Sequence, residues 1–129
     1  MSQSSMRTPL GKVRGLGSAK EGANHFIRQR VTAIANVVLV PLVLFLLIKA
    51  TRGGYESAAQ FVSNPIFAVI LILAAGAAFY HMRLGMQVII EDYVHDETAK
   101  LVLLMANTFF AVAVGLASAF AILMLSFKV

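Results

Sequence analysis

Three long apolar stretches dominate this sequence and limit what the chain can fold into. They run over residues 31–48, 66–90 and 101–127. At a rise of about 1.5 Å per residue, each is long enough, or nearly so, to cross a hydrocarbon core about 30 Å thick. Lipid offers the backbone no hydrogen bonds, and a chain this short cannot close a β-barrel. The sequence therefore predicts an all-α membrane protein with three transmembrane helices.

Polar surface is scarce in this chain. Charged residues make up 13% of its 129 residues, and its mean hydropathy is +0.80. An average soluble domain carries about 25% charged residues, so a water-soluble enzyme with its own active-site cleft is not expected. The sequence has no cysteine, which excludes disulfides, iron–sulfur ligation and thiol chemistry within this chain.

Basic residues are concentrated before the first apolar stretch. Residues 1–30 carry six of them against one acid and are punctuated by glycines, which predicts a largely flexible N-terminal arm ahead of a three-helix domain over residues 31–129. A net charge of +5 gathered at one end of an apolar chain favours membrane orientation over nucleic-acid binding. An arginine-rich, acid-poor leader also resembles a mitochondrial transit peptide, an alternative that the residues leave open.

The distribution of the basic residues also predicts orientation. Six lie before the first span, two between the first and second spans, and one between the second and third. The positive-inside rule therefore puts the N-terminus in the cytoplasm. Three crossings then place the loop over residues 49–64 and the C-terminus outside, and the acidic loop over residues 91–100 inside.

Most polar side chains within the spans have structural explanations. Four are expected to form hydrogen bonds between helices: Asn36, Asn107, Thr108 and Ser118. Small residues recur at positions 111, 115 and 119, a spacing that lets another helix approach closely. Pro41 removes a backbone donor and should bend the first span. Ser63 or Asn64 can cap a second helix that begins at Pro65.

His81 is the unusual residue of the second span, because an ionisable side chain deep in lipid is costly and points to function. It lies nine residues, about 13 Å, before the end of the apolar stretch, near the middle of the membrane. Helical spacing surrounds it with small residues: Ala74, Ala77, Ala78 and Gly85. Such neighbours leave room for a flat, bulky ligand, and a haem held by the neutral imidazole suits that shape. A hydrogen bond to a neighbouring helix is the alternative.

Three further residues of this span carry open interpretations. Arg83 lies about 200° around the helix from His81, so the two side chains do not share a face. Arg83 can pair with a carboxylate of a partner chain, pair with a haem propionate, or extend toward the inner surface of the membrane. Asp92 follows His81 by eleven residues, and if the helix continues that far, Asp92 lies on the same face about 16 Å away. Tyr93 is either an interfacial anchor or a phenol that donates a hydrogen bond to a carbonyl ligand. Asp92 is then either a solvated acid or a group that relays a proton.

The run HMRLGMQVIIEDY over residues 81–93 resembles the signature of the hydrophobic membrane-anchor subunit of succinate dehydrogenase, respiratory complex II. That family has His-x-x-x-Gly-Met and then Asp-Tyr at this spacing in its second transmembrane helix. Residues 22–34, GANHFIRQRVTAI, are similar to the family's entry segment with its Arg-x-Thr-Ala-Ile core. The stretch GSAKEG over residues 17–22 and the long arm resemble alphaproteobacterial members. The third span matches by hydrophobicity alone.

The resemblance implies roles for individual residues. His81 matches an axial ligand of haem b, and Arg30 matches an arginine near the haem propionates. Tyr93 matches the tyrosine that hydrogen-bonds a carbonyl of ubiquinone, and Asp92 matches its acidic neighbour in the quinone pocket. Arg83 has no counterpart. The chain is then a non-catalytic anchor at the bacterial inner membrane, in the enzyme that joins the tricarboxylic acid cycle to electron transport.

A partner subunit is expected for two reasons. His81 is the only histidine within the spans, so a haem with two histidine ligands needs its second ligand from another polypeptide, and three helices cannot enclose a macrocycle. In the family this partner is the cytochrome b membrane subunit, while the iron–sulfur and flavoprotein subunits dock on the cytoplasmic side. A fumarate reductase anchor and a cofactor-free membrane accessory protein are the alternatives.

Overall fold

The computed structural model describes residues 8–15 and 21–127. Helices occupy nearly all of residues 21–127 and more than half of residues 8–15, and these ranges contain no strand. The helices are α1 (Pro9–Val13), α2 (Glu21–Thr51), α3 (Gly54–Val62), α4 (Pro65–Tyr93) and α5 (Glu97–Phe127). Helices α2, α4 and α5 are long and apolar enough to cross a membrane, which confirms the predicted three-span, all-α fold. Part of the N-terminal arm, including the family-like residues 17–20, lies outside the described residues.

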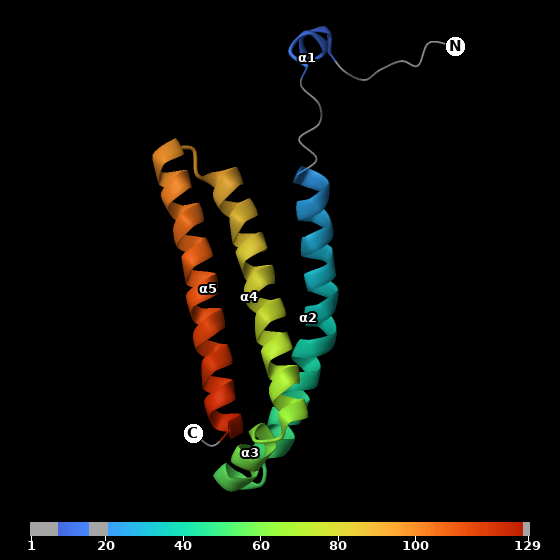
Figure 1. The fold of residues 1–129 in the computed structure, drawn as a ribbon, viewed down its shortest axis with the longest axis vertical. Coiled ribbons are helices and arrows are strands. Elements are labelled where there is room, and N and C mark those ends of the chain that lie inside the picture. Colours follow the sequence, from blue (N-terminus) through green and yellow to red (C-terminus); the bar gives the residue numbers. More distant parts are fainter. Residues whose placement is uncertain (1–7, 16–20, 128–129) are drawn as a thin grey trace, which may run out of the picture.

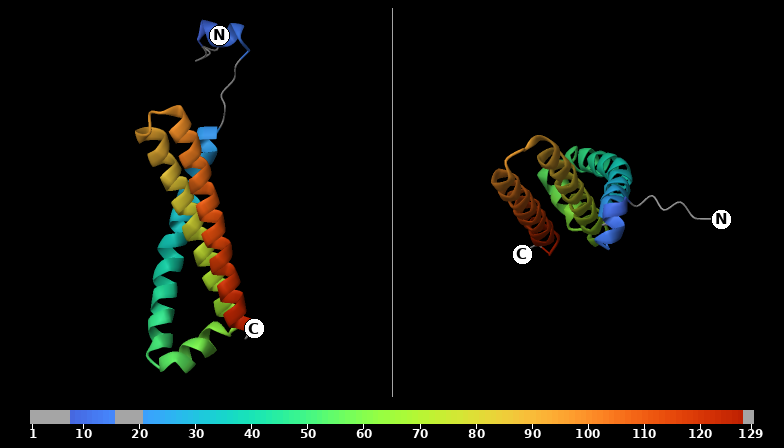
Figure 2. Two further views of the ribbon diagram at one scale, coloured as in Figure 1. Left: turned by 90° about the vertical axis from the view of Figure 1, so that its left-hand side faces the viewer. Right: turned by 90° about the horizontal axis from the view of Figure 1, so that it is seen from above.

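The three long helices lie side by side with α4 in the middle (Figure 1). Helix α4 contacts both α2 and α5, whereas α2 and α5 do not contact each other anywhere in the described chain. Seen from above, the three helices form an open row rather than a closed bundle (Figure 2). Helix α3 contacts all three long helices at one end, and the short turn between α4 and α5 lies at the other end. This row leaves two opposite faces of α4 accessible.

The helices extend beyond the predicted spans. Helix α2 begins at Glu21, so the last ten residues of the predicted flexible arm are helical. No glycine or proline follows Gly22 until Pro41, and the side chains of His25 and Gln29 are half-buried. Helix α2 continues through Pro41, and its path curves when it is viewed from above (Figure 2).

The two predicted loops are also largely helical. Helix α3 fills most of residues 49–64, and its first residue, Gly54, has a φ of +81°, a conformation that glycine adopts without steric cost. The predicted acidic loop is reduced to residues 94–96, where the Asp96 carboxylate accepts a hydrogen bond from the Ala99 backbone N–H at 2.6 Å. At about 43 Å, the 29 residues of α4 match the bilayer including its headgroups, so the helix continues past the hydrocarbon boundary. The Asn64 side chain caps α4, accepting from the Ile66 N–H at 3.0 Å, with Pro65 in the first turn as predicted.

Burial within the described chain is slight. Six hydrophobic residues are buried, and four of them are alanine: Ala50, Ala68, Ala74, Leu84, Ile90 and Ala111. Large apolar side chains point outward instead, such as Val37, Leu116 and Phe120, each more than 60% exposed. An apolar exterior of this extent suits contact with lipid or with another membrane protein.

The polar residues within the spans behave in three ways. Asn107 donates through Nδ2 to the backbone oxygen of Arg83 at 2.9 Å, and Thr108 accepts from the Arg83 Nε–H at 3.2 Å, which confirms two predicted contacts between helices. The prediction for Ser118 is wrong, because its hydroxyl donates to the Val114 carbonyl of its own helix. The Asn36 Oδ1 atom is buried and has no hydrogen-bond partner among the described residues.

Candidate functional site

His81 contacts the neighbouring helix through one of its two ring nitrogens. Its Nδ1 lies 3.0 Å from the hydroxyl oxygen of Thr32 on α2. That hydroxyl also lies 2.9 Å from the carbonyl oxygen of Arg28 and 3.1 Å from that of Gln29. A threonine hydroxyl has a single hydrogen, which one of these two carbonyls of its own helix accepts.

These distances allow one tautomer of the neutral imidazole to suit metal binding. When the Thr32 hydrogen is donated within α2, the hydroxyl oxygen accepts from the Nδ1–H of His81. The other nitrogen, Nε2, then carries a free lone pair, which is the form that binds a metal ion. A hydrogen bond from the second ring nitrogen of this kind fixes the orientation of a ligating histidine and raises its basicity.

An open hollow of about 270 Å³ lies beside His81, between α2 and α4. Its other lining residues all come from α2: Phe26, Gln29, Arg30 and Ala33. The Arg30 guanidinium lies 5.0 Å from the centre of the Phe26 ring, a cation–π distance that holds the cation against an apolar wall. The structure therefore brings together two of the predicted site residues, His81 and Arg30, on one face of the molecule.

The residues that line the hollow can be compared with those that an implied haem needs. No group of three or more histidine, cysteine or acidic side chains that could hold a metal ion occurs in the described ranges. A neutral histidine such as His81 can be an axial ligand of haem iron. A cation beside it, such as Arg30, can pair with a haem propionate. The residues present therefore fit the implied group in part.

The small residues around His81 were expected to leave space for a ligand, but they are largely covered. Ala74 is buried, and Ala77, Ala78 and Gly85 are half-buried, so this face of α4 is not left wholly open for a ligand. Helix α2 packs close enough for Thr32 to reach His81. The space for a ligand therefore lies beside the α2–α4 contact.

The other predicted site residues lie apart from His81. Tyr93 is the last residue of α4, twelve positions or about 18 Å beyond His81, and its side chain is 76% exposed. Asp92 is also exposed. Both residues were predicted to lie in the acidic loop over residues 91–100, but α4 continues through them, so Asp92 and His81 share one side of the helix. No contact in the described chain joins either residue to the His81 hollow.

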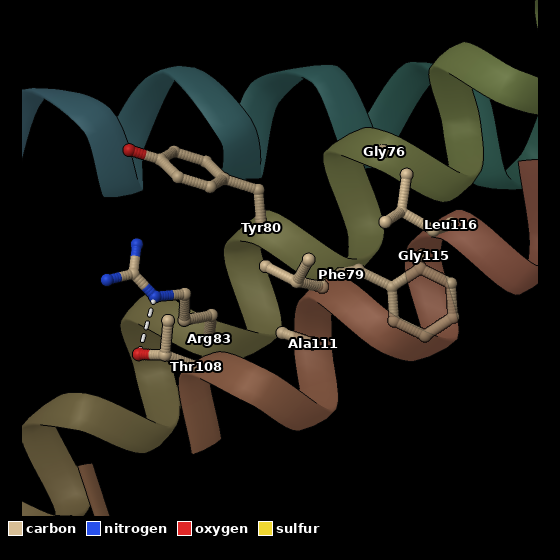
Figure 3. A pocket seen from close by; sticks show the side chains of 9 residues that line it. Gly76, Phe79, Tyr80, Arg83, Thr108, Ala111, Gly115 and Leu116 are labelled. Carbon is tan, nitrogen blue, oxygen red and sulfur yellow. Dashed lines mark hydrogen bonds between the residues drawn. The ribbon is translucent and has the colours of Figure 1, made fainter. Parts of the chain in front are cut away.

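Arg83 lines a groove on the far side of α4, as its angular position predicts. The groove lies between α4 and α5 and has a volume of about 430 Å³. Figure 3 shows the polar ends of Tyr80 and Arg83 directed toward one end, with the Arg83–Thr108 hydrogen bond, and Gly115 and Leu116 at the other. The stripe of small residues packs here, since Ala111 is buried and Gly115 faces Phe79.

Sequence reasoning missed two contributors. Thr32 belongs to the entry motif, but its role as the acceptor for His81 depends on how α2 lies against α4, which no spacing reveals. Arg28 was counted only as a charge of the arm, yet it lines a polar hollow together with Arg83. A signal did exist for Arg28, because it precedes Arg30 by two residues and so points to the opposite side of a helix.

Comparison with known proteins identifies the family of this chain. The family model for "Succinate dehydrogenase/Fumarate reductase transmembrane subunit" matches residues 4–115. The chain belongs to this family. The match includes most of α5, which the sequence motifs alone did not cover.

Several succinate dehydrogenase anchor subunits are similar along most of the chain. The hydrophobic membrane anchor subunit of Rickettsia bellii is 31% identical over 106 residues, which cover 82% of this chain and 85% of the relative. That of Paracoccus denitrificans is 30% identical over 102 residues, 79% of each chain. The membrane anchor subunit of Reclinomonas americana is 36% identical over 89 residues, 64% of this chain and 72% of the relative. No solved structure matches the chain significantly.

Membership and fold together establish the coarse role. The chain is a membrane anchor subunit of succinate dehydrogenase, and it is a non-catalytic subunit of that complex. With three apolar helices, it is a multi-pass protein of the bacterial inner membrane. An anchor subunit implies a complex with other subunits.

Proposed function

We propose that this anchor subunit supplies one axial ligand to a haem b through His81 and part of a ubiquinone-reduction site through Tyr93 and Asp92. The observation that carries the haem assignment is the Nδ1 contact with Thr32 at 3.0 Å. With the ring hydrogen on Nδ1, Nε2 is the nitrogen left to bind iron, and His81 lines an open hollow. Haem b, when bound, supplies a one-electron redox centre.

Arg30 holds the charged edge of the haem in this proposal. Its guanidinium lines the same hollow as His81 from the neighbouring helix, and a guanidinium pairs well with a carboxylate such as a propionate. The hollow is open, and the described chain offers one histidine there, so the second axial ligand and the remaining wall come from a partner. The partner we propose is the cytochrome b membrane subunit.

Replacing His81 tests the haem assignment directly. In the purified complex, His81→Ala should lower the haem content and change the reduced-minus-oxidised spectrum, because one axial nitrogen is lost. His95→Ala is the matched control, since His95 is exposed in the turn between α4 and α5. A His81→Ala complex with the wild-type spectrum and haem stoichiometry refutes the assignment. A wild-type complex without haem supports a cofactor-free accessory role instead.

The quinone proposal rests on the end of α4. Tyr93 is exposed and carries a hydroxyl that can donate to a quinone carbonyl, and Asp92 precedes it on the helix. Held there, the phenol positions the quinone oxygen as electrons arrive, and the carboxylate orients the phenol or passes it a proton from water. The exposure of both side chains requires other subunits to form the rest of this pocket.

The quinone site is tested by a matched pair of tyrosine variants. Tyr93→Phe should depress quinone reduction by the complex while succinate oxidation by a soluble dye stays intact, because only the hydroxyl is removed. Tyr55→Phe is the control, since Tyr55 is also exposed but lies on α3 at the other end of the helices. Equal losses in both assays for Tyr93→Phe count against the assignment.

Orientation and remaining partners complete the proposal. The start of α2, the end of α4 and the start of α5 lie at one end of the row of helices, and the basic residues of the arm precede α2. We place this end in the cytoplasm. The iron–sulfur and flavoprotein subunits then dock over it, and succinate oxidation takes place on those chains. Electrons reach ubiquinone near Tyr93.

A further inference from the structure

A second polar hollow lies between the first turns of α2 and the later part of α4, on the side away from Arg30 and His81. It has a volume of about 250 Å³ and is lined by Asn24, His25, Arg28, Arg83, Leu84 and Gln87. Two of these side chains are guanidiniums, and no carboxylate is among the described residues that line it. The Nε2 atom of His25 is buried and has no hydrogen-bond partner within the described chain. The Gln87 amide is donated to the Glu91 carboxylate at 2.8 Å, so the two guanidiniums supply the positive charge that the hollow offers to an anion.

Arg83 also lines the groove between α4 and α5, so the two hollows meet at one residue. Beyond Arg83 the groove is apolar, bounded by Gly76, Phe79, Gly115 and Leu116. Arg83 donates its Nε–H to Thr108, which holds the guanidinium at the junction while its terminal nitrogens remain available among the described contacts. A ligand that fills both hollows must have an anionic head and an apolar tail.

The depths of the two hollows give the order of the head and the tail. Arg28 lies about 10 Å along α2 from its first residue, and Arg83 lies about 15 Å from the end of α4. The exposed Arg28 side chain reaches from this depth toward the headgroups, while Thr108 holds the Arg83 guanidinium at the junction of the two hollows. Gly76 is about 25 Å from the same end of α4, well inside the hydrocarbon. Cations near the headgroups with an apolar groove beneath them match one leaflet of a phospholipid bilayer.

We propose that this face of the subunit binds an anionic phospholipid. Its phosphate lies between Arg28 and Arg83, and one acyl chain occupies the groove between α4 and α5. The site is separate from the proposed haem site, because residues two apart point to opposite sides of a helix. On α2 this separates Arg28 from Arg30, and on α4 it separates Arg83 from His81.

The phosphate end is tested with arginine variants of the whole complex. Delipidated complex is incubated with phosphatidylglycerol or with zwitterionic phosphatidylcholine, and retained lipid is counted by native mass spectrometry. The wild type should retain one phosphatidylglycerol more firmly than phosphatidylcholine. Arg28→Gln and Arg83→Gln should each weaken that retention about fivefold. Arg52→Gln is the matched control, because Arg52 is exposed at the other end of α2.

The acyl-chain end is tested at Gly76. A Cβ added at Gly76 meets no heavy atom within 4 Å, so Gly76→Leu fills the groove without moving the backbone. It should displace the lipid, while Gly76→Ala leaves most of the space and should retain it. Subunit stoichiometry and the thermal unfolding temperature show whether each variant complex is intact. Arg28→Gln provides a second test, because Arg28 is exposed and tolerates substitution better than Arg83.

Three outcomes overturn the proposal. The first is equal retention of phosphatidylglycerol by the wild type and by both arginine variants, or no retention by the wild type. The second is displacement of phosphatidylglycerol by millimolar inorganic phosphate, which indicates a site for a free anion. The third is quantitative crosslinking of a Gly76→Cys variant to another protein subunit, which indicates that a partner helix fills the groove.

Discussion

Thr32→Val removes the hydroxyl that accepts the hydrogen bond from His81 and keeps the shape of the side chain. In the structure this hydroxyl lies 3.0 Å from Nδ1 and is the only recorded partner of the imidazole in the described chain. Valine replaces the oxygen with a methyl group, so the Nδ1–H is left without a partner between α2 and α4. The imidazole stays in place but loses the contact that fixes its orientation and its tautomer.

The expected cost follows from the geometry. A hydrogen bond of this length between uncharged groups contributes about 0.5–1.5 kcal/mol to stability, so the complex should remain assembled. The effect on a metal ligand is larger, because loss of the partner of a ligating histidine lowers metal affinity about 10- to 100-fold. That range corresponds to about 1.4–2.8 kcal/mol. We therefore expect haem retention to fall much more than stability does.

Haem transfer from the oxidised complex to apomyoglobin measures this effect, alongside the reduced-minus-oxidised spectrum. Thr32→Val should release haem about 10- to 100-fold faster with the spectral shape preserved, and Thr32→Ser should restore retention. Thr51→Val is the control, since the Thr51 hydroxyl bonds two carbonyls of the same helix, those of Leu47 and Ile48, and contacts no histidine. Wild-type retention in Thr32→Val, together with haem loss in His81→Ala, refutes the role assigned to Thr32.

Two further predictions concern orientation and packing. Because the chain has no cysteine, Tyr55→Cys should react with a membrane-impermeant maleimide added outside spheroplasts, and His95→Cys only after the membrane is opened; the reverse pattern contradicts a cytoplasmic N-terminus. Asn107→Leu removes the bond to the Arg83 carbonyl and should lower the free energy of unfolding in denaturant titrations by about 0.6 kcal/mol. An unchanged unfolding curve means that this contact adds nothing to the α4–α5 association.

Much of the fold was predictable because lipid restricts a chain so strongly. Long apolar stretches with few internal charges permit only helices, and the cap at Asn64 with Pro65 after it marks the start of α4 correctly. Helix ends were harder to predict, since the apolar pattern stops at the hydrocarbon boundary while the hydrogen-bonded backbone continues through the headgroups. For this reason α2 begins at Glu21 and not at Val31.

The candidate site was predictable where one helix determines the geometry. The angle between His81 and Arg83 follows from helical spacing, which places Arg83 on the far side of α4 as the structure has it. The extension of α4 to Tyr93 lies beyond the predicted span. Contacts between helices were not predictable in the same way. The Thr32–His81 hydrogen bond depends on the relative height of α2 and α4, and the hollow shared by Arg28 and Arg83 depends on their relative rotation.

The absence of contact between α2 and α5 bears on how this protein tolerates change. Substitutions at distant sites that share no partner generally have additive energetic effects, so changes on the outward faces of α2 and α5 should add, whereas changes where either helix meets α3 or α4 should couple. Helix α4 has no such independence, because an alteration at Arg83 reaches Thr108 on one side and the α2 hollow on the other. Tolerance to mutation should therefore rise from the central helix toward both flanks.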